Sequence, residues 1–149
     1  MNRIQKMAWL MVICGGSGLI LSATAVTIGY FMAGFPQAWA GMGFLGIAGF
    51  GGLGPIIFKK DPGPVQMDER DTLIARKAAI ASFALSYMVF IFTCMGLWEY
   101  YQFKGIETIS INILPNLVWP PGITAFLSHA IVILFLYGKD NKQMERGVA

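Results

Sequence analysis

The chain has 149 residues, of which 56% are hydrophobic and only 13% are charged, and its formal net charge is +3. A soluble domain of ordinary composition has about 25% charged residues, so this chain could not cover a water-exposed surface. Its mean hydropathy is +0.60, and its apolar runs have roughly the 20 residues that a membrane helix needs. These features indicate an integral membrane protein. The positive charge does not indicate direct nucleic-acid binding, because the basic residues lie in short connections where they set orientation.

Four apolar runs predict four transmembrane helices in an all-α antiparallel bundle that forms one domain, residues 1–149. Arg3 and Lys6 precede the first run, which could therefore be read as a signal peptide. Its apolar sequence continues through Phe35, however, past the 7–15 residues of a signal-peptide core, and we expect residues 1–25 to be retained. The spans are predicted at about 8–33, 38–58, 78–98 and 120–137.

The basic residues lie on alternate sides of the predicted spans. Of the 11 Lys and Arg residues, all except Lys104 fall in the N-terminal tail, the second connection or the C-terminal tail. Basic residues stay on the cytoplasmic side of a membrane. We therefore predict a multi-pass protein of the cell membrane, typical of a bacterial inner membrane, with both termini in the cytoplasm. The aromatic residues expected at the two membrane interfaces are Trp9, Trp39, Trp98, Tyr100, Tyr101, Trp119 and Tyr137.

The second span is rich in glycine, and four of its glycines recur every three residues, at Gly43, Gly46, Gly49 and Gly52. Small residues let membrane helices approach closely, so we predict helix packing along a groove that winds slowly around this helix. The simplest arrangement is a hairpin with the first span. A homo-oligomer face and a flexible gating helix are the alternatives.

A charged segment leads into the third span. Asp68 suits a helix N-cap, and Glu69 and Asp71 would fall in the first turn, where the helix dipole favours negative charge. Arg76 and Lys77 follow about two turns later. One interpretation is a capped helix end with orientation charges. The other is a surface for a cytoplasmic partner, and its candidate residues are Asp68, Glu69, Arg70, Asp71, Arg76 and Lys77.

The run Asp68-Glu69-Arg70-Asp71, followed by Ile74 and by Lys77-Ala78, resembles a "DERD…I…KA" segment. That segment lies in the central cytoplasmic loop of a family of small uncharacterised bacterial and archaeal membrane proteins with four predicted spans. Members are often encoded beside helix-turn-helix regulators, so the resemblance implies a membrane partner for a transcription factor. The family has no established catalytic residues, and the resemblance therefore implies none here.

His129 is the one ionisable side chain near the middle of a predicted span. An ionisable group inside a membrane is expensive unless it has a partner, and we expect a hydrogen bond to Tyr87 or Thr24. A proton-responsive or ligand-contacting role for His129 is the alternative. Cys14 and Cys94 are predicted about 20 Å apart along the membrane normal, too far for a disulfide or a shared metal ion. We therefore expect no metal site.

In the connection before the fourth span, isoleucines alternate with polar residues from Thr108 to Ile113. This period of two suits a short strand or a segment lying on the lipid headgroups.

The sequence favours a non-enzymatic membrane protein that acts through protein contacts, as a tether or partner of a cytoplasmic regulator or as a homo-oligomer. No cofactor is expected. A small transporter or channel subunit, with His129 lining its pathway, is the alternative. An enzyme is disfavoured because acid–base or nucleophilic chemistry needs several positioned groups.

Overall fold

The computed structural model describes residues 2–34, 37–58, 69–108 and 111–147, and every element in this part of the chain is a helix. Four helical segments are long and apolar enough to cross a membrane, which confirms the predicted all-α class and is compatible with a multi-pass membrane protein. In chain order the elements are α1 (Arg3–Ala33), η1 (Gln37–Leu53), α2 (Gly54–Ile57), α3 (Glu69–Phe103), η2 (Ile111–Leu117) and α4 (Trp119–Gly147).

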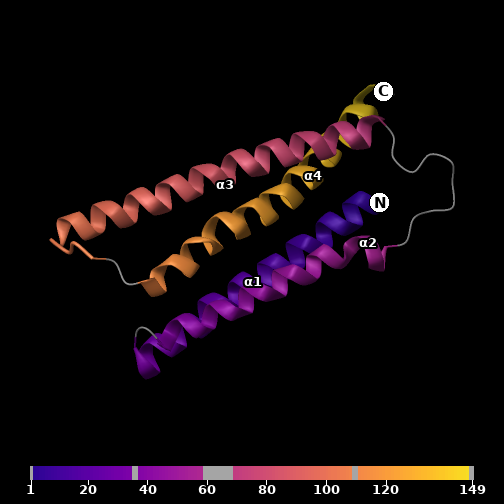
Figure 1. Cartoon of the computed structure of the whole chain (residues 1–149). Helices are drawn as coiled ribbons and strands as arrows, with labels where there is room; N and C mark the ends of the chain where they lie inside the picture. The colour runs from indigo at the N-terminus through magenta and orange to yellow at the C-terminus, as the bar shows by residue number, and fades with distance from the viewer. Residues whose placement is uncertain (1, 35–36, 59–68, 109–110, 148–149) are drawn as a thin grey trace.

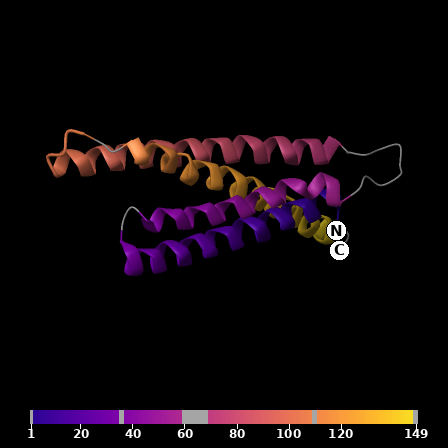
Figure 2. The ribbon, with the colours of Figure 1, turned by 60° about the horizontal axis from the view of Figure 1, so that its bottom comes forward.

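The long helices pair as two hairpins, α1 with η1 and α3 with α4, and the hairpins meet mainly where α1 packs against α4 (Figure 1). α1 and α3 begin, and α2 and α4 end, at the same end of the molecule, which we call the terminal end. In a second view α4 runs obliquely between α3 and the α1–η1 pair (Figure 2). Because the long helical segments alternate in direction, the start of α1 and the end of α4 lie at the same end of the molecule.

The hairpins join at a small apolar core near the terminal end. Ala8 of α1, Ala78 of α3 and Ala130 of α4 are at most 1% exposed, and they lie in one cluster. Alanine at each position allows the three backbones to approach closely, which is how membrane helices associate without a hydrophobic drive. Larger side chains complete the cluster around the alanines, and these are Ile4, Ile74, Ile133 and Tyr137.

The second span differs from the sequence prediction, because η1 is a 3-10 helix over 17 residues and becomes α-helical only at Gly54. Runs of 3-10 helix longer than three or four residues are uncommon. Packing against α1 accounts for the geometry. The glycine contacts of the hairpin pair Ala38 with Gly29 at one end and Gly54 with Met7 at the other. The α1 stretch covers about 33 Å at 1.5 Å per residue, and its shorter partner covers about 32 Å only at the 3-10 rise of 2.0 Å.

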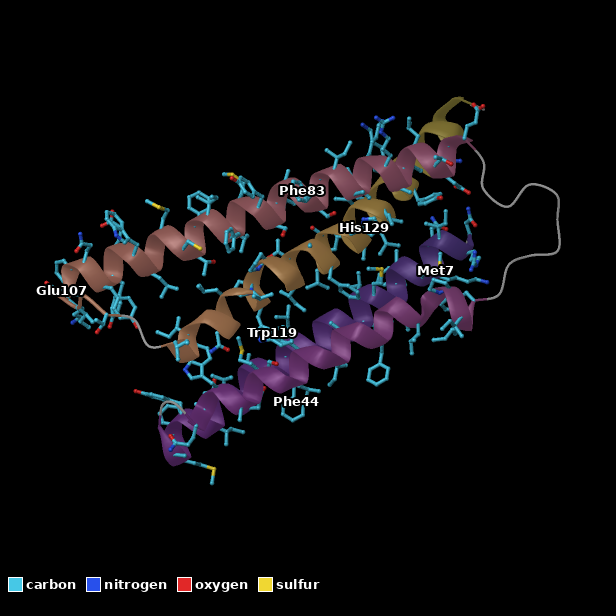
Figure 3. All side chains as sticks on the ribbon, in the orientation of Figure 1. Met7, Phe44, Phe83, Glu107, Trp119 and His129 are labelled. Carbon is cyan, nitrogen blue, oxygen red and sulfur yellow. The ribbon has the colours of Figure 1, made fainter. Side chains whose placement is uncertain are left out.

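A period of three residues also changes the predicted glycine groove. With 3.0 residues per turn, Gly43, Gly46, Gly49 and Gly52 form a straight row instead of a winding one. A Cβ added at any of the four would meet nothing within 4 Å, so the row does not lie in the hairpin contact. The bulky residues beside it include Phe44, which points away from the other helices (Figure 3).

The hairpin predicted for the first two spans is present, but other glycines make its closest contacts. A Cβ added at Gly41 would lie 2.6 Å from the backbone nitrogen of Val26, and one added at Gly51 would lie 3.0 Å from Met11 Cα. A side chain at either position would collide with the α1 backbone, and backbone atoms cannot move away by changing rotamer. The close approach of η1 to α1 therefore depends on these positions and not on the predicted row.

The connection before α4 contains a further difference. Ile111–Leu117 forms the 3-10 helix η2, so the strand interpretation is wrong from Ile111 onward, and residues 109–110 lie outside the described part. Pro115 has no N–H for a strand ladder, and it interrupts the alternating pattern two residues after Ile113.

Gly41→Ala should lower the free energy of unfolding by about 1–3 kcal/mol, the usual cost of overpacking, because its Cβ would meet the α1 backbone. Gly46→Ala is the matched control. Its Cβ would enter open space, and the lower entropy of the unfolded chain should leave stability equal or higher by up to about 1 kcal/mol. Unfolding in mixed micelles, followed by circular dichroism, measures both. Equal losses would contradict the assigned contact surface.

Candidate functional site: the polar cluster at the terminal end

Asp71, in the first turn of α3, is the centre of a polar cluster that three helices contribute to. Its two carboxylate oxygens accept hydrogen bonds from the Asn2 side-chain nitrogen at 3.3 and 3.1 Å, and one of them also accepts from the Tyr137 hydroxyl. Asn2 precedes α1 and Tyr137 belongs to α4. Hydrogen bonds to an ionised group contribute more than neutral ones, so Asp71 holds α1 and α4 at the start of α3.

Arg70 and Tyr137 make a second contact in this cluster. The guanidinium carbon of Arg70 lies 5.7 Å from the centroid of the Tyr137 ring, within the range of a cation–π contact. Tyr137 is only 4% exposed. Its ring packs in the alanine core, while its hydroxyl reaches Asp71, so one side chain joins the apolar core to the polar cluster.

Arg3 extends the cluster to the end of the second span. Its Nε donates to the carbonyl oxygen of Phe58 at 2.7 Å, and its Nη2 donates to that of Pro55 at 3.2 Å. The last carbonyls of a helix lack partners within the helix and attract a basic side chain. Arg3 thus closes the end of α2, while its neighbour Asn2 bonds the start of α3. Arg3 therefore closes the first hairpin, and Asn2 joins that hairpin to the second.

The structure divides the predicted partner segment between two faces of α3. Ile74 and Ala78 are buried, and Arg70 and Asp71 are half-buried on the same inward side. Asp68 lies outside the described residues. The outward side is exposed and repeats at the three- and four-residue spacing of one helix face, with Glu69, Thr72, Leu73, Arg76 and Lys77.

His129 lies apart from this cluster, on α4, where it lines a cavity of about 530 Å³ between α1, α3 and α4 (Figure 3). Ser82 and Ser86 of α3 line the same cavity. The two hydrogen-bond partners predicted for His129 are engaged elsewhere. Thr24 donates to the Ile20 carbonyl, and Tyr87 stacks on Phe83 with 6.5 Å between ring centroids. Neither contact involves His129; the ring stack does not use the Tyr87 hydroxyl, and the Thr24 oxygen can still accept, so the bond to His129 stays a prediction.

Sequence reasoning missed Asn2 and Tyr137 as partners of Asp71. Tyr137 was expected at the membrane interface because of its residue type, yet it is buried in the core. The position of Tyr137 in the chain could have indicated this contact, because in an antiparallel hairpin the end of the fourth span lies beside the start of the third.

The hydrogen bonds of the cluster fix helix ends. Within the described residues, no group of three or more His, Cys, Asp or Glu side chains could hold a metal ion. Cys14 and Cys94 are both free thiols.

The fold is an all-helical one with four helices long and apolar enough to cross a membrane, and a polar cluster ties α1, α3 and α4 together at one end. No protein-family model, curated protein or solved structure matches the chain.

Tyr137→Phe should lower the free energy of unfolding by about 1–3 kcal/mol, because it removes a hydrogen bond to a partly buried carboxylate. Tyr87→Phe is the control, since Tyr87 is 56% exposed and its described contact is a ring stack that phenylalanine retains. Denaturant titration of both variants in the same micelles measures the difference. If both variants are as stable as the parent chain, the hydrogen bond from Tyr137 to Asp71 does not contribute to the free energy of unfolding.

Proposed function

We propose that this chain is a non-enzymatic membrane protein with both termini in the cytoplasm, and that it tethers a cytoplasmic regulator through the outward face of the start of α3. That face consists of Glu69, Thr72, Leu73, Arg76 and Lys77. The observation that carries the proposal is an exposed, mixed charged and apolar face on a helix end that two other segments, the start of α1 and the end of α4, hold in place.

The length of α3 supports a part outside the bilayer. Its 35 residues extend about 52 Å at 1.5 Å per residue, whereas about 20 residues are enough to cross the hydrocarbon core. The most apolar part of the helix follows Lys77. Under the predicted orientation, about two turns at the start of α3 therefore stand at or above the cytoplasmic surface.

The polar cluster supports the rigidity of this surface. A lone helix end of two turns would fray in water, because short helices are marginal without tertiary contacts. Here Asp71 accepts hydrogen bonds from the start of α1 and the end of α4 on the inward side. The outward side is thus presented on a fixed frame, which reduces the conformational entropy that a partner would have to overcome on binding.

The resemblance of residues 68–78 to the "DERD…I…KA" segment supports the kind of partner. A helix-turn-helix regulator held at the membrane would need a cytoplasmic contact surface, and the exposed face supplies both charge and an apolar side chain. Leu73 is 53% exposed, and apolar anchors surrounded by charged residues are common in protein interfaces.

A photo-crosslinking residue in place of Thr72, introduced into the full chain in native membranes, should form a covalent adduct with a soluble DNA-binding protein. Glu69→Lys and Leu73→Asn should each reduce the adduct at least tenfold, because they alter the charge and the apolar anchor of the face.

The matched control is Glu107→Lys, which makes the same charge change on an exposed glutamate at the opposite end of the molecule (Figure 3). Its adduct should equal that of the parent chain. Absence of any adduct, or an adduct that resists both substitutions at the face, would contradict the tether.

A transporter or channel subunit is the second candidate, and the observation that favours it is His129 in the cavity between α1, α3 and α4. This function predicts solute or proton flux in reconstituted vesicles that His129→Leu abolishes without changing the helix content. Ser128→Ala is the control, because the Ser128 hydroxyl donates to the Ala125 carbonyl of its own helix. Flux that is absent, or that survives His129→Leu, would exclude this assignment.

A further inference from the structure

A second cavity, of about 570 Å³, lies between α1, η1 and the start of α4, in the half of the molecule away from the terminal end. Its walls are mostly apolar, with Leu19 and Val26 from α1 and Leu45 from η1. Trp39, at the start of η1, and Trp119, at the start of α4 and labelled in Figure 3, also line it. Small-molecule sites have this size and character, with a few polar groups that orient the ligand.

Ser22 is the polar group that sets this cavity apart. It lines the cavity, it is 3% exposed, and its hydroxyl oxygen has no hydrogen-bond partner among the described residues. Hydroxyl side chains inside a helix usually bond to a carbonyl of the preceding turn. The other hydroxyls of α1 do so: Ser17 donates to Cys14, Thr24 to Ile20 and Thr27 to Ala23.

The close packing of η1 on α1 fixes Ser22 in place. One turn before Ser22, Gly18 packs against the Phe44 carbonyl. One turn after Ser22, the backbone nitrogen of Val26 packs against Gly41. A buried hydroxyl without a partner costs about 1–3 kcal/mol. The packing that surrounds Ser22 therefore holds a residue of the cavity wall whose buried hydroxyl has no hydrogen-bond partner among the described residues.

The depth of Ser22 decides which occupant suits it. It lies seven residues, or about 10 Å at 1.5 Å per residue, below Gly29, which packs against the start of η1. At that depth a phospholipid offers acyl chain, which cannot accept a hydrogen bond. The described lining contains no charged residue, and an ionic ligand would remain unpaired there.

We propose that this cavity is a binding site for a small uncharged lipophile, dissolved in the membrane, that carries a single hydrogen-bond-accepting oxygen of the alcohol or ketone class. The apolar body of the lipophile lies beside the two tryptophans, and its oxygen accepts a hydrogen bond from the Ser22 hydroxyl. This site is independent of the proposed contact surface, which lies at the start of α3, at the terminal end of the molecule.

Tryptophan quenching tests the site in the full chain, reconstituted in vesicles of unbrominated phospholipid. Replacing Trp9 and Trp98 with phenylalanine leaves Trp39 and Trp119 as the reporters. A bromodecanol should quench them saturably, with half-saturation at a membrane concentration about fivefold lower than bromodecane, which has no oxygen, as expected for the net effect of one hydrogen bond.

Ser22→Ala should remove the fivefold difference between the two probes. Thr27→Val is the matched control, because Thr27 lines the same cavity but its hydroxyl already bonds to Ala23, and the difference should persist. Ala23→Phe places a ring in the cavity and should abolish saturation, while circular dichroism confirms an unchanged helix content.

Two outcomes would overturn the proposal. A chain that keeps only Trp9 and Trp98 should show quenching that rises linearly, and the same linear rise for Trp39 and Trp119 would show that ordinary acyl chains fill the space. A difference between bromodecanol and bromodecane that persists in Ser22→Ala would show that the hydroxyl of Ser22 does not bind the probe.

Discussion

The arrangement of the helices depends on one junction, where α1, α3 and α4 meet near the terminal end. Ala8, Ala78 and Ala130 allow the three backbones to touch, and small residues are needed because lipid supplies no hydrophobic drive between helices. Asp71 stands directly beside this core and accepts hydrogen bonds from Asn2 and Tyr137. Away from the junction the contacts become fewer, and only the α1–η1 and α3–α4 hairpins continue. The cavities lie in the spaces that this one-ended attachment leaves between the hairpins.

The second span shows how a packing constraint can select an unusual backbone. It must stay in contact with α1 from Gly29 to Met7, but it has fewer residues for that distance. The 3-10 rise of 2.0 Å per residue resolves the mismatch, and the glycine-rich sequence permits it because few side chains crowd the narrower helix. A consequence is that residues three apart share one face. Leu45, Ala48, Gly51 and Gly54 are all buried against the rest of the protein, whereas the row of Gly43, Gly46, Gly49 and Gly52 is open.

The two proposed roles use different parts of the same plan. At the terminal end, the polar cluster occupies the inward side of α3, so Leu73, Arg76 and Lys77 on its outward side are exposed, as the proposed tether requires. In the other half, α4 leaves the α1–η1 pair far enough to form a cavity around Ser22. The helices between these regions expose mostly large apolar side chains, including Phe31, Phe83 and Phe135, as expected for a surface in contact with lipid.

The sequence by itself predicted an all-helical chain with four segments long and apolar enough to cross a membrane, because the cost of burying charge in lipid can be read from local composition. It also singled out the start of α3, although not the division of that segment into an inward and an outward face. Only the tertiary structure decided that Tyr137 is a core residue bonded to Asp71, that Gly41 and Gly51 make the close contacts, and that Ser22 lacks a partner. These features depend on the rotation and register of each helix against its neighbours. Hydropathy is summed along one segment of the chain, so it carries no information about the rotation or the register of a helix.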